Sequence, residues 1–398
     1  MSMDRLLHTP ELEAFRAELR AFLRESLPAD IRAKVAEERM DLPKEDQRRW
    51  HKILLKKGWV CPNWPREHGG PGWDDAHQYV FEREMALADA PRPMTYGTSM
   101  LGPTLIRYGS ADQKKTVLPR IRAGEDFWCQ GFSEANAGSD LAALQCRAVR
   151  HGDRYVINGA KMWTSEGHIA DRMFGLFRTD SSGKKQHGIT FLLVDMAAKG
   201  VEVAPIWTYD GGGREVNQVF LGDVEVPIEN RVGEEHGGWT VAKYLLSLER
   251  FGIAEVSRSL RSLGRLKEFA ASQQRGNRSL LDDPDFARRV AEAEIALRAV
   301  ELTELRLLFG PAGGGAEASL LKLRGTEVQN EILELMYDAV GLHAFVEIGD
   351  PELSAGAPAG PPQSRHAAHA YFNYRKTMIY GGSNEIQRNI IAKHVLGL

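Results

Sequence analysis

The segment Gly188-Ile-Thr-Phe-Leu-Leu-Val194 is short, strongly apolar and partly β-branched. Such a run is typical of a buried β-strand. Further runs of strand character surround it, at residues 148–149, 155–157, 201–205 and 219–227. Short strands at this spacing predict a compact β-barrel or sandwich in the middle of the chain.

Helical patterns lie on both sides of these strands. Residues 10–23 space their apolar side chains by three and four, and the helical period returns after Gly238. Helices are expected at 239–274, 284–309, 316–340 and 386–395, with loops at 310–315 and 350–362. The order is helices, strands, helices, without βαβ alternation. We therefore predict an α+β protein with an N-terminal helical domain (1–125), a small β-barrel (126–236) and a C-terminal helical bundle (237–398).

The composition excludes several classes of protein. The 398 residues carry a net charge of −3 and no basic block, so nothing indicates a nucleic acid or an anionic membrane as partner. Three cysteines without paired spacing predict neither a disulfide framework nor a metal site. No apolar run is long enough to cross a membrane, and no signal sequence is evident. We expect a cytoplasmic, bacterial-type protein.

Common catalytic motifs are also absent from the sequence. It contains no P-loop, no C-x-x-C, no H-E-x-x-H and no G-x-S-x-G. The nearest match to the dinucleotide pattern, at residues 313–318, follows a helix rather than a strand, and we reject it. These absences argue against a nicotinamide Rossmann enzyme, an NTPase, a zinc hydrolase and an α/β-hydrolase.

Glu249 stands out within the apolar stripe of the helix expected after Gly238. At about 100° per residue, its neighbours in projection include Leu245 and Ile253. A carboxylate in such a position must be paired, protonated or functional, because burial of a bare charge is costly. One alternative is a structural Glu neutralised by an arginine.

Three segments carry chemistry together: Trp128 to Leu141, Asn158 to Ser165 and Met378 to Ile391. Alone, they read as a loop, a strand end and a helix cap. Together, at these separations, they resemble the acyl-CoA dehydrogenase family, and the helix–barrel–helix order extends the likeness over essentially the whole chain. Within that family the sequence is most similar to the large subunits of bacterial pimeloyl-CoA dehydrogenase and of steroid side-chain acyl-CoA dehydrogenases.

The resemblance implies FAD as cofactor. In the first segment, Ser133 would bind the flavin edge together with backbone groups near Phe132, and Ser139 would lie at the mouth of the substrate channel. In the second, Trp163 would pack against the isoalloxazine and Ser165 would reach its N5 and O4 region. The cofactor residues implied across the family motifs are Gln130, Phe132, Ser133, Ser139, Trp163, Thr164, Ser165, Arg275, Ser383 and Glu385.

The third segment opens a helix after Gly381-Gly382. Asn384 with Gln387 three residues later suits a capping arrangement. The N–H groups at that helix start could meet the FAD diphosphate or adenosine. In the family, the residues that match Ser383 to Glu385 contact FAD, commonly from a neighbouring subunit.

The resemblance also assigns the catalytic base. Many members carry a catalytic Glu at the position of Gly381, whereas branched-chain and long-chain members carry it on the helix after the barrel, in the context that Leu248-Glu249-Arg250 matches. Glu249 would remove the Cα proton while the Cβ hydride passes to flavin N5, and Gly381 with Gly382 would bind the thioester. Arg250 either pairs with a substrate phosphate or carboxylate or forms a surface salt bridge.

Departures from the family pattern cluster at the FAD site between subunits. Arg275-Gly-Asn-Arg278 and Ala339-Val-Gly-Leu-His343 replace family loops, and Ala135 replaces a proline. These differences fit a heterotetramer in which a small-subunit paralogue supplies part of the site. A homo-oligomer (dimer or tetramer) is the other expected assembly. The expected function is dehydrogenation of an acyl-CoA, with electron-transfer flavoprotein as acceptor. Alternatives are a non-catalytic or half-site subunit and a relative with other chemistry.

Overall fold

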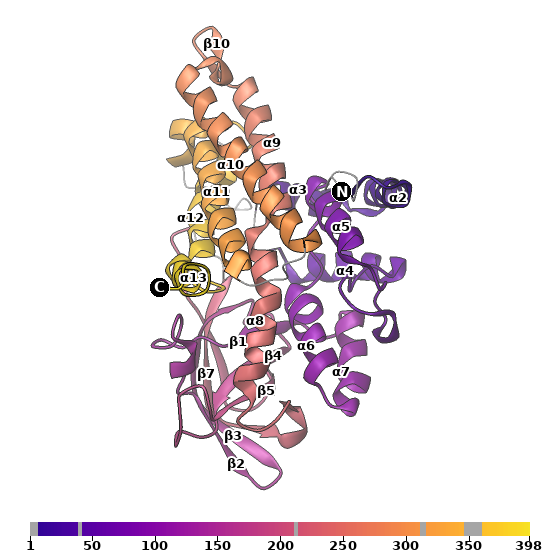
Figure 1. The fold of residues 1–398 in the computed structure, drawn as a ribbon, viewed down its shortest axis with the longest axis vertical. Helices are drawn as coiled ribbons and strands as arrows, with labels where there is room; N and C mark the ends of the chain where they lie inside the picture. Colours follow the sequence, from indigo (N-terminus) through magenta and orange to yellow (C-terminus); the bar gives the residue numbers. More distant parts are fainter. Residues whose placement is uncertain (1–6, 39–41, 211–213, 311–315, 346–359) are drawn as a thin grey trace, which may run out of the picture.

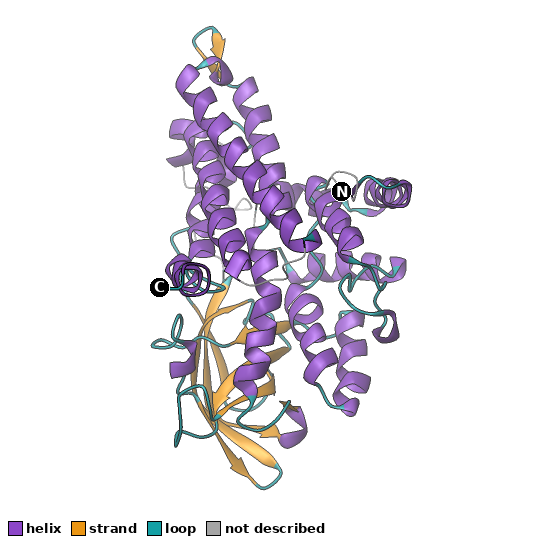
Figure 2. Ribbon diagram, viewed as in Figure 1, coloured by secondary structure: helices purple, strands orange, loops and turns teal. Residues whose placement is uncertain are grey.

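The computed structural model describes residues 7–38, 42–210, 214–310, 316–345 and 360–398. The side chains of residues 249–251, 275 and 316 fall outside the description, as do large parts of the two predicted loops at 310–315 and 350–362. Figure 1 shows helices at both ends of the chain and strands in its middle, and Figure 2 separates the helical part from the sheet. The predicted α+β class, with its helix–strand–helix order, is confirmed.

The N-terminal part is helical because its sequence carries clear start and stop signals. Thr9 caps the first long helix and Pro10 occupies its first turn. Ser110 and Gln113 form a reciprocal capping box at the start of α7. The helices are α2 (Pro10–Ser26), α3 (Ala29–Ala36), α4 (Lys44–Lys57), α5 (Asp75–Leu87), the π-helix η2 (Tyr96–Leu101), α6 (Gly102–Tyr108) and α7 (Ala111–Ala123).

The middle part forms one sheet of eight strands within the described residues. Its order is β6-β7-β3-β2-β4-β5-β8, and β1 pairs in parallel with β4. The predicted central run becomes β5, in which every residue except Asp195 is buried. The strands are β1 (Trp128–Gly131), β2 (Arg147–His151), β3 (Arg154–Ser165), β4 (Arg172–Arg178), β5 (Ile189–Asp195), β6 (Val201–Pro205), β7 (Val216–Pro227) and β8 (Arg231–Val232).

The C-terminal part is a bundle of long helices. They are α8 (Gly238–Ala254), α9 (Val256–Ser272), α10 (Pro284–Phe309), α11 (Ala316–Val340), α12 (Ser364–Asn373) and α13 (Asn384–Ile391). A short hairpin, β9 (Gln274–Arg275) with β10 (Arg278–Ser279), joins α9 to the region of α10. None of the described helices is long and apolar enough to cross a bilayer.

The prediction of one continuous helix over 239–274 is wrong, because the structure has two helices there. Glu255 adopts a left-handed conformation (φ 41°) and divides it into α8 and α9. At this point Gly325 of α11 approaches so closely that a Cβ there would lie 2.9 Å from Cα of Ala254. The carboxylate of Glu255 is bound by side chains from two other segments, so tertiary contacts accompany the break.

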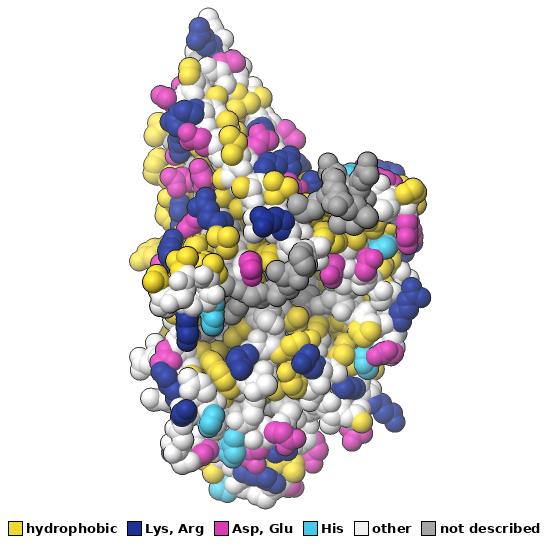
Figure 3. All heavy atoms as spheres, viewed as in Figure 1, with side chains coloured by type: hydrophobic (Ala, Val, Ile, Leu, Met, Phe, Trp, Pro, Cys, Tyr) yellow, Lys and Arg dark blue, Asp and Glu magenta, His cyan; other side chains and the backbone are white. Residues whose placement is uncertain are grey.

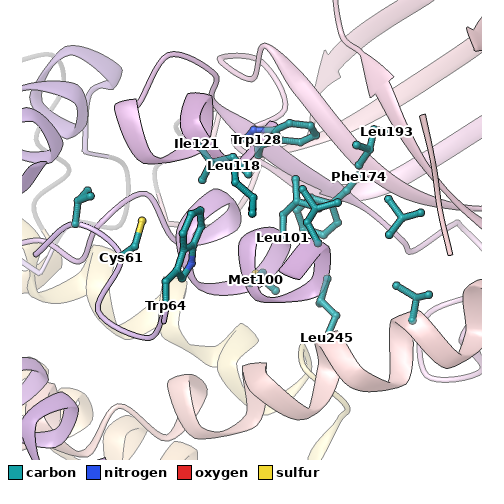
Figure 4. Packing of buried hydrophobic residues seen from close by; sticks show 14 of the residues in the cluster. Cys61, Trp64, Met100, Leu101, Leu118, Ile121, Trp128, Phe174, Leu193 and Leu245 are labelled. Atoms are coloured by element: carbon teal, nitrogen blue, oxygen red, sulfur yellow. The ribbon is translucent and has the colours of Figure 1, made fainter. Parts of the chain in front are cut away.

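One hydrophobic core joins the N-terminal helices, the sheet and α8. Figure 4 shows Trp64, Leu101, Phe174 and Leu245 converging from four different parts of the chain, all of them buried. Because α8 contributes to the same core as β5, its position relative to the sheet is fixed by packing. The boundaries at 126 and 237 stay predictions.

Candidate active site

The loop after β1 is anchored at its first residues. Phe132 is buried and packs edge-on against Phe174 and Phe191, with ring centroids 5.9 and 6.0 Å away. The carbonyl oxygen of Ser133 accepts a hydrogen bond of 2.8 Å from the backbone N–H of Met162 on β3. The structure therefore brings the first two predicted segments together, at Ser133 and Met162.

The middle of the same loop is held by Glu134. Its carboxylate accepts hydrogen bonds from the backbone N–H groups of Gln145 (2.7 Å) and Cys146 (3.0 Å). The buried ammonium of Lys161, on β3, donates to the same carboxylate. Ser139, further along the loop, is exposed. The loop thus keeps a fixed base and an accessible tip, although Ala135 stands where the family has proline.

Trp163 is presented to solvent by an irregularity in β3. The pairing of β3 with β7 shifts register between Lys161 and Thr164, and Trp163 takes a φ of 62°. Its side chain is 56% exposed, which is unusual for a tryptophan next to a packed sheet. Strained backbone and an exposed aromatic face both point to a binding function.

The next two residues differ in accessibility. Thr164 is fully buried, and its Oγ1 has no hydrogen-bond partner within the structure. Ser165 is half-buried at the end of β3. A ligand can therefore reach Trp163 and Ser165, whereas the side chain of Thr164 between them is buried.

A hollow of about 150 Å³ adjoins the loop and β3. Polar side chains, backbone and small residues line it, among them Glu134, Asn136, Lys161 and Gln218. Gln130, on β1, is half-buried next to the start of the loop. Met162, which also lines the hollow, directly precedes the exposed Trp163. A polar hollow next to this part of β3 fits a cofactor with polar substituents.

Helix α8 supplies the position of the predicted base. Leu245 and Ile253 are buried on this helix, and position 249 lies four residues from each of them. The side chains of Glu249 and Arg250 lie outside the described residues. The buried residues on either side nevertheless form the apolar stripe from which Glu249 was predicted to be the base.

The segment before α13 is a tight turn. Gly381 and Gly382 have φ values of 63° and 84°, which favour glycine. The side-chain amide of Gln387 donates to the carbonyl oxygens of both glycines, at 3.3 and 3.0 Å. These hydrogen bonds fix the turn. Because residue 381 is glycine, no side chain there could act as a base.

The helix cap differs from the one predicted. Ser383, not Asn384, is the N-cap, with its Oγ accepting from the N–H of Ile386 at 3.4 Å. Asn384 is buried, and its Oδ1 accepts from the buried ammonium of Lys322 at 2.9 Å. Glu385 is exposed. Burial of Asn384 against α11 removes it from the capping position.

Arg275 belongs to a different region of the molecule. The hairpin that carries it stands at the far tip of the helical bundle, at the end opposite to the sheet (Figure 1). The side chain of Arg275 lies outside the described residues. Within one chain this position is far from the sheet, and the expected contact of Arg275 across a subunit boundary stays a prediction.

Two structural features were not predicted from the sequence. The π-helix η2 packs against α8 and β1, and π-turns recur at functional sites. Its sequence signal is Gly97 and Gly102-Pro103 inside an otherwise helical stretch. The second feature is the set of ion pairs that Glu255 forms with Arg92 and Arg258, for which the sequence offers no local signal.

The cysteines take no part in the chemistry. All three are buried and free. Burial raises the pKa of the Cys61 thiol to about 12 and that of Cys146 to about 11. Among the described residues, no cluster of histidine, cysteine or acidic side chains could hold a metal ion. On the face shown in Figure 3, charges of both signs are interspersed.

Comparison with known proteins covers the whole chain. Residues 9–125, 129–224 and 236–396 match the N-terminal, middle and C-terminal domains of acyl-CoA dehydrogenase. The chain is 36% identical to acyl-CoA dehydrogenase IpdE1 of Mycobacterium tuberculosis, over 98% of both chains, and 34% identical to acyl-CoA dehydrogenase FadE26 of the same organism, over 99% of this chain and 98% of the other.

Solved structures agree with this assignment. The Tcur3481-Tcur3483 steroid ACAD shares 31% identity with a TM-score of 0.84, covering 98% of this chain and 99% of the other. The ChsE4-ChsE5 complex from Mycobacterium tuberculosis shares 30% identity with a TM-score of 0.82, over 98% of both chains. This chain therefore belongs to the acyl-CoA dehydrogenase family, whose members are oxidoreductases acting on CH–CH bonds.

Proposed function

We propose that this protein catalyses the FAD-dependent α,β-dehydrogenation of an acyl-CoA thioester to the trans-2-enoyl-CoA. The family uses FAD, and the accessible indole of Trp163 suits an isoalloxazine. Ser133 and Ser165 would hold its polar edge. When bound, FAD accepts at N5 the hydride that leaves Cβ.

Glu249 is the proposed base. It would remove the Cα proton of the thioester. The buried residues Leu245 and Ile253, four positions before and after it, support a base on this stripe of α8. The backbone N–H of Gly381 would polarise the thioester oxygen, which makes the Cα proton more acidic. Gly382 and Ser139 would line the path of the thioester and the CoA arm, and Arg250 would contact a phosphate or carboxylate.

One observation carries this assignment. Nη1 of Arg258 lies 3.6 Å from Oε2 of Glu255, and the guanidinium of Arg258 also lies over the ring of Tyr374, 4.6 Å from its centroid. Glu255 directly follows α8, and Tyr374 begins the short helix η7 (Tyr374–Met378) that leads to Gly381. The end of α8 is therefore linked to the segment before the Gly381 turn, which supports a base on α8 for a thioester bound at Gly381.

The oligomeric state and partners are part of the proposal. The distance between the Arg275 hairpin and Trp163 within one chain supports a site completed by a second subunit, either another copy or a small-subunit paralogue. The similar ChsE4-ChsE5 complex pairs two differently named chains. Electron-transfer flavoprotein is the proposed electron acceptor. A chain that binds no flavin by itself would favour the half-site alternative.

Anaerobic flavin reduction tests the proposal. The purified chain, alone or with its paralogue, should be yellow and should bleach on addition of an acyl-CoA. Glu249→Gln should retain the flavin and lose the bleaching, because the amide cannot take the proton. Glu268→Gln, an exposed position on α9, serves as the matched control and should bleach normally. Bleaching of Glu249→Gln at the rate of the unmodified protein would overturn the assignment of the base.

A further inference from the structure

Glu215 lies between the two halves of the proposed site. It directly precedes β7, whose first residue, Val216, pairs in register with Ser165 of β3. The backbone carbonyl oxygen of Glu215 accepts a hydrogen bond of 2.7 Å from the N–H of Glu166, the residue after Ser165. The backbone of Glu215 is therefore tied to the end of β3, where Trp163 and Ser165 are expected to meet the flavin.

The side chain of Glu215 binds the C-terminal bundle. Nδ2 of Asn373, the last residue of α12, donates to its Oε2 at 2.7 Å, and the ammonium of Lys376, in η7, donates to its Oε1. Only 14% of the Glu215 side chain and 27% of the Lys376 side chain are exposed, and Asn373 is buried. Because water and salt screen such a partly buried ion pair less than a surface pair, it is a firm link between the two segments.

Lys376 is joined in turn to the segment that carries Gly381. Its backbone carbonyl oxygen accepts hydrogen bonds from the N–H of Ile379 at 2.8 Å and from the N–H of Tyr380 at 2.9 Å. Tyr380 directly precedes Gly381, the proposed thioester site. The side chain of Glu215 therefore connects the end of β3 with the segment before the thioester turn.

Each half of the site also has contacts of its own. In η7, Oγ1 of Thr377 donates to the carbonyl oxygen of Tyr374 at 2.8 Å, and Nδ2 of Asn330, on α11, donates to Oγ1 of Thr377 at 3.1 Å. The end of β3 is held by its pairing with β7. Removal of the Glu215 side chain would leave these contacts in place and would remove a direct link between the two halves.

We propose that Glu215 is a positioning residue for the dehydrogenation: its carboxylate sets the distance between the flavin edge at Ser165 and the thioester at Gly381. The inference rests on the proposed function and adds a residue to it. Two bound groups react well only when their reacting atoms lie about 3–3.5 Å apart, and a misplacement of about 1 Å lowers a rate about a hundredfold. Glu215 governs the rate through the two segments that it joins, without contact to flavin or substrate.

The rate of flavin reduction in variants of Glu215 tests the inference. Butanoyl-CoA, octanoyl-CoA and hexadecanoyl-CoA are compared first, and the probe is the thioester that bleaches the flavin-loaded protein, or its complex with the paralogue, fastest. Glu215→Ala should lower the limiting rate about ten- to a hundredfold while KM stays within about twofold, because alignment is lost and binding is kept. Glu215→Gln keeps an acceptor oxygen for one of the two partners and should lose less.

A double-mutant cycle shows whether Glu215 acts through Lys376. Lys376→Met should also lower the limiting rate, and Glu215→Ala/Lys376→Met should be no slower than Glu215→Ala, because both changes remove the same contact. A rate that falls by the product of the two single effects would overturn the coupling. Glu225→Ala, which breaks an exposed ion pair with Arg154 between the same two strands, is the matched control and should leave the rate unchanged.

Hydrogen exchange of the flavin-free chain measures the same link without turnover. In Glu215→Ala, but not in Glu225→Ala, the backbone amides of Glu166, Ile379 and Tyr380 should exchange about tenfold faster, as expected for loss of a hydrogen bond to a charged group. Unchanged exchange together with an unchanged reduction rate would overturn the inference and leave the dehydrogenase function standing. If none of the three thioesters bleached the unmodified protein, the proposed function would fail, and the exchange rates alone would decide whether Glu215 couples the two segments.

Discussion

Nζ of Lys161 lies 2.8 Å from Oε1 of Glu134, and the Lys161 side chain has no accessible surface while that of Glu134 is 12% exposed. The same ammonium donates to the carbonyl oxygen of Leu176 at 2.6 Å. Because Glu134 also binds two backbone N–H groups, this pair ties the loop after β1 to the sheet. The loop that carries the predicted flavin contacts thus depends on a buried ion pair.

Lys161→Met should destabilise the protein by about 3–5 kcal/mol, because it leaves the Glu134 carboxylate buried without its counter-charge. The double variant Lys161→Met/Glu134→Gln should recover part of this loss. Urea unfolding measures both. Arg172→Met, which breaks the half-exposed pair with Asp195, is the control and should cost no more than about 1 kcal/mol. Equal losses for Lys161→Met and Arg172→Met would contradict the role of burial.

Trp163→Ala should separate binding from stability. With over half of the side chain exposed, its removal should change the unfolding free energy of the flavin-free chain by no more than about 0.5 kcal/mol. Flavin affinity should fall about two- to tenfold, since an aromatic contact contributes about 0.5–1.5 kcal/mol. Fluorescence titration of FAD measures this change. Leu302→Ala, exposed on α10, should alter neither quantity. Unchanged FAD affinity in Trp163→Ala would remove Trp163 from the site.

Glu304 should make stability depend on pH. Burial, with Glu82 and Glu301 nearby, raises the pKa of Glu304 from 4.5 to about 8, against the opposing effect of Arg92 and Arg83. Between these values the folded protein keeps a proton that the unfolded chain has lost, so this group lowers stability progressively as pH rises through the interval. Glu304→Gln should therefore be more stable than the unmodified protein at about pH 9 and nearly equal to it at about pH 4.

The measurement for Glu304 is the unfolding midpoint across that pH range. Glu292→Gln, in an exposed ion pair with Arg288 on the same helix, should leave the pH profile unchanged. Parallel profiles for Glu304→Gln and the unmodified protein would show that Glu304 titrates normally in the folded state.

Gly102→Ala tests the packing at the end of the π-helix. A Cβ at this position would overlap the indole ring of Trp64, whose N–H donates to the carbonyl oxygen of Thr98 at 2.7 Å. Overpacking of this kind should cost about 1–3 kcal/mol. Gly264→Ala on α9, where the added Cβ has space, should instead stabilise by about 0.4–1 kcal/mol. Thermal unfolding of the two variants distinguishes them, and a stable Gly102→Ala would show that Trp64 can move.

Much of the architecture could be predicted because it follows from local patterns. The strand at 189–195 follows from a continuous apolar run, and the helix at 10–26 follows from apolar side chains spaced by three and four. The motif around Ser133 and Trp163 predicted a shared site, and the hydrogen bond between Ser133 and Met162 brings the two segments together. The roles of all the predicted site residues stay predictions, and for Glu249, Arg250 and Arg275 the side chains lie outside the described residues.

The two wrong predictions, the cap at Asn384 and the continuous helix over 239–274, share a physical cause. The cap at Ser383 and the break at Glu255 are both set by contacts with α11, through Asn384 and Lys322 in one case and through Gly325 and Gln329 in the other. Partners more than 60 residues away in sequence leave no local signal.

The sequence by itself determined the order of helices and strands, the family motifs and the loss of a side chain at Gly381, because these depend on residue type and spacing. Only the tertiary structure decided what surrounds them. It buried Lys161 beneath the loop after β1, exposed Trp163 through a register shift, and placed Arg92 and Arg258 around Glu255. Burial and long-range pairing are properties of the folded chain, and they determine which of the encoded groups can reach a substrate.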